Sequence, residues 1–240
     1  VQSEIAGTVA QALIAEVTPE GSSAADGNIP PIVPGSTTNV AAYDAYLRGR
    51  ALYTASVDEA SERAALAQFD AAIAADPGYA AAHAARARSL TAIANQYGEV
   101  GQLAGLYDAA IASARRAIAL APDLADAHST LGFTLFQGRL DVRAAREPFE
   151  RSRELGEGEA TVMSRYAQFS ARIGHKREAA KAMKRALLLD PLNPLIHRAA
   201  ASIEYAARNY AGSIPPARQA LVLNPPMSRV HAAIGDALLM

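Results

Sequence analysis

Four prolines divide most of this chain into related intervals, and each one follows an alanine-rich stretch with the composition of a helix. They are Pro77, Pro122, Pro191 and Pro225, and the last two lie 34 residues apart. A repeat of this length and composition predicts units of two helices, which stack because a single unit cannot bury its apolar face alone. The intervals therefore predict a stack of helix pairs.

Small residues recur at three fixed positions when each repeat is numbered so that its closing proline is residue thirty-two. Two helices approach to about 8–10 Å only where the residues at the crossing are small. We therefore expect the helices to cross at these positions. The eighth, twentieth and twenty-seventh positions hold, respectively, Gly49, Ala87, Gly132, Ala167, Ala201 and Gly235; Ala65, Ala110, Ala145, Ala179 and Ser213; and Ala72, Ala117, Ser152, Ala186 and Ala220.

Small residues at these three positions, together with a closing proline, resemble the tetratricopeptide repeat (TPR) family over roughly residues 41–240. The resemblance implies an all-α fold, a right-handed superhelix (α-solenoid) of about five repeats plus a terminal helix. The implied units are repeats 41–79, 80–124, 125–159, 160–193 and 194–227, followed by the terminal helix 228–240.

The first 40 residues differ in composition from the repeats. Residues 1–17 are expected to form an amphipathic helix, and residues 18–40 are rich in proline, glycine and serine, as in a linker. The apolar residues of the expected helix recur every four positions, at Val1, Ile5, Val9, Leu13 and Val17.

The order of these segments carries a second resemblance. Gln2–Ala6, a proline-rich linker and then Ala42–Arg50 are similar to the C-terminal part of bacterial multidomain signalling proteins. In those proteins an effector domain, a class III adenylate cyclase or a winged-helix DNA-binding domain, is followed by a Tol-B-like α/β domain and then by the TPRs. The resemblance implies that the first helix is the tail of that preceding α/β domain. It leaves open the bacterial cytoplasm or the periplasmic side of a membrane-anchored protein.

Two repeats carry insertions between their helices. In the first repeat, Ser56–Glu59 has the spacing of a capping box, which predicts an early start for the second helix. In the second repeat the insertion is Asn95–Leu106, and its three glycines predict that it does not form a long helix.

Prolines also fall inside two expected second helices. Pro148 lies in the third repeat, and Pro215 and Pro216 lie in the fifth. Proline in a helix interior costs about 3 kcal/mol. We therefore expect the second helix of the fifth repeat to start late, with Ser213 as its cap.

Composition argues against several classes of protein. The formal net charge of −1 argues against general nucleic-acid binding, which needs a basic face. No stretch approaches the roughly 20 apolar residues of a membrane span, so we expect no membrane insertion by this segment. A phosphate-binding loop, His-Glu-x-x-His and Gly-x-Ser-x-Gly are all missing from the sequence. We therefore expect no enzymatic activity and no cofactor.

The histidines are expected to be structural. Equivalent positions on successive first helices lie at least about 8–10 Å apart, whereas zinc needs ligand nitrogens about 2 Å away. Asp123, Asp126 and His128 are close in sequence, but they fit a turn and a helix start, where acids are favourable. No metal is expected. Four of the five histidines occupy the fourth position of a repeat: His83, His128, His197 and His231.

The concave groove of the solenoid is the expected binding site. The resemblance implies that specific positions of the first helices line it. Arginines and aromatic rings with a single acid suit an acidic or extended peptide. The mapped residues are Arg50, Tyr53, Arg88, Ser129, Phe133, Arg165, Gln168, Arg172, Arg198 and Tyr205, with Tyr46, Asp126, Phe136 and Ser164 beside them.

These observations predict a non-catalytic protein–protein interaction scaffold that binds a peptide or protein segment in the groove. The chaperone-tail carboxylate clamp of the family is not matched, since Tyr46 and Arg50 replace its lysine and asparagine. Two alternatives stay open at this point. One is a homo-oligomerisation module, for example a homodimer through the terminal helices, and the other is a small-molecule sensor that uses the insertion of the second repeat.

Overall fold

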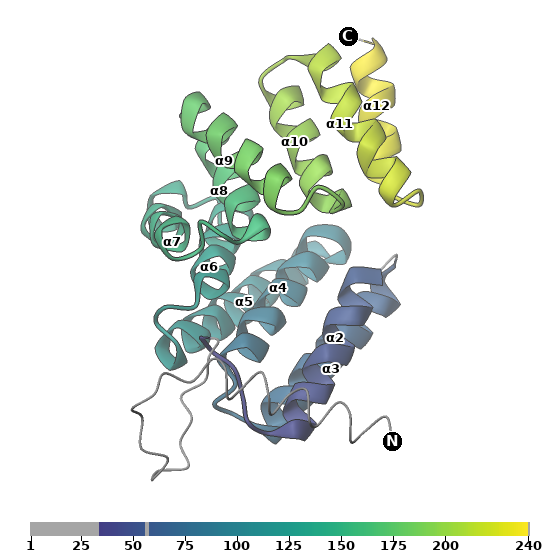
Figure 1. Ribbon diagram of the computed structural model, residues 1–240. Coiled ribbons are helices and arrows are strands. Elements are labelled where there is room, and N and C mark those ends of the chain that lie inside the picture. Colours follow the sequence, from purple (N-terminus) through teal and green to yellow (C-terminus); the bar gives the residue numbers. More distant parts are fainter. Residues whose placement is uncertain (1–33, 56–57, 240) are drawn as a thin grey trace, which may run out of the picture. The chain divides into compact units, whose positions relative to one another are not determined.

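The computed structural model describes residues 34–55 and 58–239, and these residues form eleven α-helices and no strand (Figure 1). The expected N-terminal helix and most of the expected linker lie outside the described residues. The helices are α2 (Val40–Ala55), α3 (Glu59–Ala75), α4 (Ala80–Tyr97), α5 (Val100–Leu120), α6 (Ala125–Gly138), α7 (Val142–Leu155), α8 (Ala160–Arg172), α9 (Lys176–Leu189), α10 (Pro194–Ala206), α11 (Tyr210–Leu223) and α12 (Ser228–Leu239).

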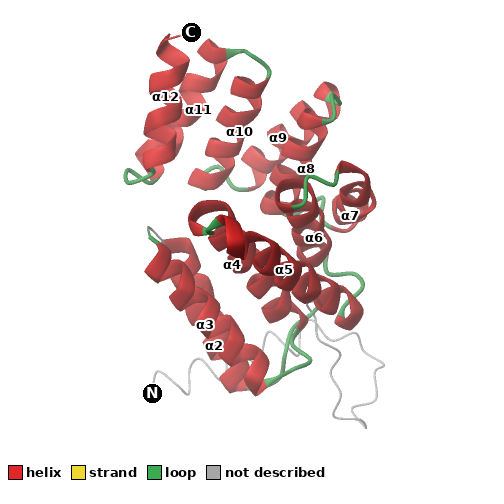
Figure 2. Cartoon of the chain, turned by 180° about the vertical axis from the view of Figure 1, so that it is seen from behind, coloured by secondary structure: helices red, strands yellow, loops and turns green. Residues whose placement is uncertain are grey.

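The helices pack in consecutive pairs. The pairs are α2 with α3, α4 with α5, α6 with α7, α8 with α9, and α10 with α11, and α12 packs on α11 (Figure 2). The second helix of each pair contacts the first helix of the next, and the first helices α4, α6, α8 and α10 contact one another in order. The expected all-α solenoid of stacked helix pairs is therefore confirmed. No described helix is long and apolar enough to span a membrane.

Small residues at the three repeated positions do lie at helix crossings. All of them are buried except Gly235. A Cβ added to Gly49 would lie 2.6 Å from the ring of Phe69, and one added to Gly132 would lie 3.0 Å from the ring of Phe149. The first and second helices of these repeats can approach so closely because the first helix has no side chain at the crossing.

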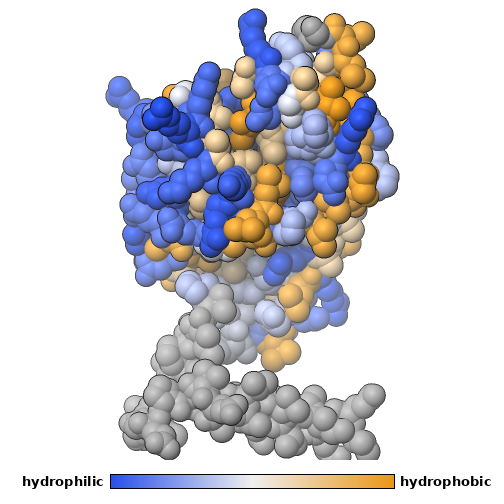
Figure 3. Space-filling model, turned by 45° about the horizontal axis from the view of Figure 1, so that its top comes forward, coloured by the Kyte–Doolittle hydropathy of each residue, from blue (hydrophilic) through white to orange (hydrophobic). Residues whose placement is uncertain are grey.

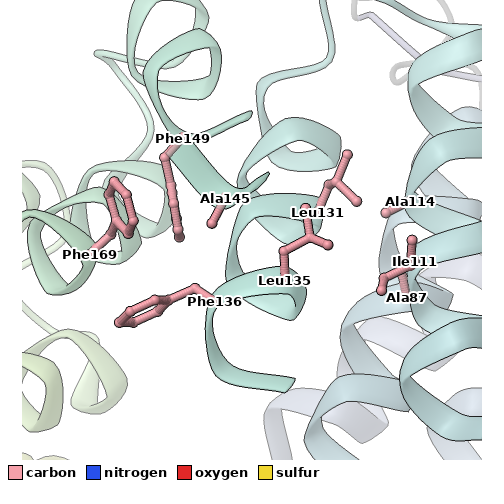
Figure 4. Close-up of a cluster of buried hydrophobic side chains, with 9 residues drawn as sticks. All are labelled: Ala87, Ile111, Ala114, Leu131, Leu135, Phe136, Ala145, Phe149 and Phe169. Atoms are coloured by element: carbon pink, nitrogen blue, oxygen red, sulfur yellow. The ribbon is translucent and has the colours of Figure 1, made fainter. Parts of the chain in front are cut away.

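Aromatic rings fill the core where the third and fourth repeats meet (Figure 4). Phe149 of α7 and Phe169 of α8 stack with their centroids 4.5 Å apart, and the edge of Phe136 meets Phe169 at 5.5 Å. Phe136 was expected in the groove, but it is only 9% exposed and belongs to this core. The mapping was wrong here because the side chain turns toward α7 and α8.

Each histidine at the fourth position bonds to the closing proline of the preceding unit. The Nε2 atom of the ring donates to the proline carbonyl six residues earlier, at 2.8–3.1 Å. Glu157 replaces the proline between the third and fourth repeats, and Met163 replaces the histidine there. The structural role expected for these histidines is therefore confirmed, as a hydrogen bond that ties one unit to the turn before it.

The insertion of the second repeat does not form one long helix, because Gly98 and Glu99 interrupt it, but its other residues lengthen the helices on both sides. It extends α4 to Tyr97 and starts α5 at Val100. The hydroxyl of Tyr107 on α5 donates to Asn95 Oδ1 at 2.7 Å, which ties the two extensions together. Each glycine inside a helix costs only about 1 kcal/mol, and this packing outweighs that cost.

The start of α11 also differs from the prediction. The helix begins at Tyr210, and Asn209 caps it by accepting a hydrogen bond from the backbone N–H of Gly212 at 3.1 Å. Ser213 is inside the helix, and its own N–H already bonds to the carbonyl of Asn209. In the first repeat the early start of α3 is confirmed, but the cap is Asp58, which pairs with Ser61.

Candidate functional site

Four first helices bring charged side chains together on one face of the stack. We call Arg50 of α2, Arg88 of α4, Asp126 of α6 and Arg165 of α8 the arginine cluster. All three arginines act electrostatically on Asp126, although Arg50 and Arg165 are more than a hundred residues apart in sequence. The stacking of the repeats alone makes them neighbours.

Asp126 is shared by two arginines. Nη1 of Arg88 lies 3.3 and 3.2 Å from the two carboxylate oxygens of Asp126. Nη1 of Arg165 lies 3.4 Å from Oδ1 of Asp126 and donates to Oγ1 of Thr130 at 3.0 Å. The side chains of Arg88, Asp126 and Arg165 are only 18%, 22% and 11% exposed. This is a partly buried network rather than a surface ion pair.

The arginines set the charge state of the cluster. Burial would raise the pKa of the Asp126 carboxyl, but Arg88, Arg165 and Arg50 outweigh burial and hold that pKa below its usual value. Burial lowers the pKa of the Arg165 guanidinium, and Asp126 only partly offsets this. The two buried arginines thus share the carboxylate of Asp126, and the pKa of the Arg88 guanidinium is raised although burial lowers it, because Asp126 and, more weakly, Glu62 act on it.

Two further acids lie near the cluster. Glu62 of α3 acts on Arg88 more weakly than Asp126 does. Glu159 is exposed at the start of α8, and burial together with Asp126 raises the pKa of its carboxyl. Asp126 is the carboxylate that contacts both Arg88 and Arg165.

Each arginine of the cluster also lies over an aromatic ring. The guanidinium carbon of Arg88 is 5.3 Å from the ring centroid of Tyr53, and that of Arg165 is 5.4 Å from the centroid of Phe133. Arg50 lies 5.8 Å from the centroid of Tyr46. Such contacts stabilise a cation by about 0.5–2 kcal/mol and fix the plane of the guanidinium group.

The hydrogen bonding of the cluster is incomplete. Charge-assisted N–H···O bonds are usually about 2.7–2.9 Å long, so the contacts of Asp126 are long ones. The Nε atom of Arg88 is buried and has no acceptor among the described residues. A buried N–H donor without an acceptor is costly, which makes this atom a candidate contact for a ligand oxygen.

The other predicted site residues lie elsewhere. Gln168 and Arg172 line a small depression between α8 and α10, together with Gln137 and Ser202. Arg198 is exposed on α10.

Two more predicted positions differ in exposure. Tyr205 is half-buried and packs against the ring of Tyr210, with the centroids 5.2 Å apart. Ser129 has no exposed surface, so in this conformation it cannot contact a ligand, which corrects its assignment to the groove. Sequence mapping placed it there because it could not show how closely neighbouring first helices cover the fifth position.

Thr130 is a site residue that the sequence mapping did not name. It occupies the sixth position of its repeat, one of those that line the groove in the family, and its hydroxyl accepts a hydrogen bond from Arg165.

Among the described residues, no group of three or more histidines and acidic residues is arranged to hold a metal ion.

Comparisons with known proteins support the fold. No family model matches the sequence, and no curated protein matches it either. A solved TPR protein from Thermus thermophilus is 19% identical with a TM-score of 0.64, and the alignment covers 83% of this chain and all of that one. Human IFIT1, solved as a dimer with m7Gppp-AAAA, is 17% identical with a TM-score of 0.68.

The alignment to IFIT1 covers 82% of this chain and 46% of that one, so the chain spans about half the length of IFIT1. The Cut9–Hcn1 hetero-tetramer of the APC/C gives 18% identity and a TM-score of 0.56, over 82% of this chain and 40% of that one. At such identities a likeness is evidence for the fold alone. The chain therefore has the TPR fold that its proline intervals predicted.

Proposed function

We propose that this chain is a non-catalytic protein–protein interaction scaffold that binds an extended peptide segment along its first helices, with an acidic residue of the peptide at the arginine cluster. The observation that carries the proposal is the gathering of Arg50, Arg88 and Arg165 around one carboxylate, that of Asp126. Arginine and aromatic side chains are the types most enriched at energetic centres of interfaces. The contacts with Tyr46, Tyr53 and Phe133 place both types together.

Assembly with another protein is known for one protein of this fold. Cut9 was solved as a hetero-tetramer with Hcn1. IFIT1 was solved with m7Gppp-AAAA, an anionic RNA, so an oligonucleotide is a necessary control. The net charge of −1 favours a peptide over a nucleic acid for this chain.

The proposal is tested by selecting peptides from a displayed random library on the immobilised chain. We expect enrichment of peptides that contain aspartate or glutamate. The selected peptide is then labelled and titrated with the chain by fluorescence polarisation, and a short capped RNA is titrated in parallel. Tight RNA binding without any peptide enrichment would contradict the proposal.

A matched pair of variants on α2 locates the site. Arg50 is exposed on the side of the cluster, so Arg50→Ala should weaken peptide binding about tenfold without altering helicity. Arg48 pairs with Asp44 on the same helix, 2.7 Å away, and its side chain is 68% exposed. We expect Arg48→Ala to bind the peptide as the unchanged chain does. Equal effects of the two substitutions would place the peptide elsewhere.

Self-association through the terminal helix is the main competing function. Leu238 and Leu239 of α12 are 63% and 88% exposed. Figure 3 shows hydrophobic side chains gathered at the upper right, on the side where Figure 1 places α12. Light scattering at increasing concentration separates the two functions, because the scaffold proposal expects a constant monomer mass.

The wider context is also part of the proposal. We infer that the chain is a module of a larger bacterial signalling protein. The inference rests on the order of its first segments, Gln2–Ala6, a proline-rich linker and then Ala42–Arg50. The sequence encoded before Val1 tests this, since a cyclase or winged-helix domain is expected there. A small-molecule sensor is the remaining alternative. A thermal-shift screen tests it, and stabilisation by a metabolite rather than by acidic peptides would favour the sensor.

A further inference from the structure

We propose that Asp126 is an internal stand-in for a ligand carboxylate: Arg88 and Arg165 form a receptor for one carboxylate group, and Asp126 holds that position while the groove is empty. The inference rests on the proposed function, because it names the chemical group that the groove takes and the residue that opposes its binding. It makes Asp126 a determinant of affinity rather than a contact residue for the ligand.

The first argument is the geometry of the arginine pair. Guanidinium groups have five N–H donors each and match a carboxylate best through two parallel bonds. Within the described part of the chain, Arg88 and Arg165 make their hydrogen bonds through Nη1 alone. One carboxylate is spread over two cations at 3.2–3.4 Å, and Nε of Arg88 has no described acceptor. A second carboxylate has donors available to it.

The second argument is the position of Asp126 in its helix. It is the second residue of α6, in the first turn of that helix and near its positive end. The cap residue is Leu124, which provides no side-chain acceptor. A carboxylate from outside that replaced Asp126 would meet two guanidinium groups and the positive end of a helix at once.

The third argument is access. The cluster is partly buried, but the side chain of Asp126 is 22% exposed and those of Arg88 and Arg165 are 18% and 11% exposed. A small carboxylate can therefore reach the position once the side chain of Asp126 has been removed. Arg50, which is exposed and close enough to lower the pKa of Asp126, adds a further positive charge on the approach.

Chemical rescue tests the receptor directly and needs no peptide. We expect Asp126→Ala to lower the Tm of the chain, because two buried cations lose their shared anion. Added sodium acetate should restore part of the loss, while sodium chloride at the same ionic strength should not. The matched control is Asp123→Ala, which removes the partner of Arg151 at an exposed ion pair of 3.0 Å. If acetate raises the Tm of both variants equally, the inference is overturned.

Peptide affinity tests the competition by Asp126. Asp126→Asn keeps the size of the side chain and removes its charge, so it also serves if Asp126→Ala does not fold. A selected peptide with glutamate should bind this variant about tenfold tighter than the unchanged chain, and its glutamine analogue should bind both equally. Weaker or unchanged binding of the glutamate peptide by the folded variant would overturn the inference.

The two tests also separate the inference from the proposed function. If the unchanged chain selects no peptide, the scaffold proposal fails, while the acetate experiment still decides whether the arginine pair receives a carboxylate. Peptides with a free or an amidated C-terminus show whether the carboxylate belongs to a side chain or to the chain end. A loss of affinity on amidation alone assigns the chain end.

Discussion

Single residues with positive φ angles shape the turns inside the third, fourth and fifth repeats. Leu140, Gly174 and Arg208 have φ values of 55°, 85° and 61°. An L-residue with a side chain pays about 1–2 kcal/mol in this conformation, whereas glycine does not. Leu140 is 80% exposed, so its side chain gains little from packing. We expect Leu140→Gly to raise the free energy of unfolding by about 1 kcal/mol, measured by urea denaturation.

The reverse change at the equivalent turn is the control. A Cβ added to Gly174 would meet no atom within 4 Å, so Gly174→Ala introduces backbone strain without a clash. We expect it to lower stability by about 1 kcal/mol. If Leu140→Gly destabilised the chain as well, packing of the Leu140 side chain would outweigh the backbone strain inferred there.

At the scale of helices, α5 is the element that the sequence described least well. Gly105 lies in the interior of α5, and a Cβ added there would meet no atom within 4 Å. Gly138, at the end of α6, packs against Tyr107 of α5. A Cβ added to Gly138 would lie only 2.3 Å from the Tyr107 ring. Gly105→Ala should therefore stabilise the chain by about 0.8–1 kcal/mol. Gly138→Ala should destabilise it by about 1–3 kcal/mol through overpacking. Thermal unfolding of both variants checks the pair, and a destabilising Gly105→Ala would argue against a helix at that residue.

Helices were predictable where repeat spacing determined them and less so where local signals competed with packing. Pro191 and Pro225 end helices at the expected interval, and the small residues of the crossings were identifiable because the spacing recurs. The glycines of α5 and Pro215 in α11 suggested breaks that do not occur. A glycine inside a helix costs only about 1 kcal/mol, and the Tyr107–Asn95 bond holds α5 against α4.

The site was predictable in composition but not in arrangement. Arg50, Arg88 and Arg165 were identifiable because each occupies a groove position of its own repeat. The role of Asp126 as their common partner could not be predicted. An acid at the start of a helix is already explained by the positive helix end, so its sequence position did not point to a partner. The pairing depends on how α4, α6 and α8 stack, which is a property of the whole molecule.

At the scale of the whole molecule, the cluster links stability to pH. The pKa of Asp126 is held below its ordinary value of 3.8 in the folded chain. A depressed folded pKa adds stability that is fully present above the unfolded pKa and is lost as the pH falls through the folded pKa. Glu159 acts in the opposite direction, because its folded pKa is raised, so it lowers stability as the pH rises. A single pH profile therefore mixes both groups.

A comparison of variants isolates Asp126. We expect Asp126→Asn to cost about 2–3 kcal/mol in the free energy of unfolding at pH 7, because the two arginines lose their shared charge. This difference from the unchanged chain should shrink between about pH 5 and pH 2 as Asp126 is protonated. Burial, the larger cause of the raised pKa of Glu159, is common to both proteins and cancels, whereas the smaller part that Asp126 causes is lost in the variant. Urea denaturation at a series of pH values measures it, with Asp123→Asn as the exposed control, for which a difference under about 1 kcal/mol is expected. A difference that stayed constant down to pH 2 would mean that packing, not the charge of Asp126, holds α4, α6 and α8 together at the cluster.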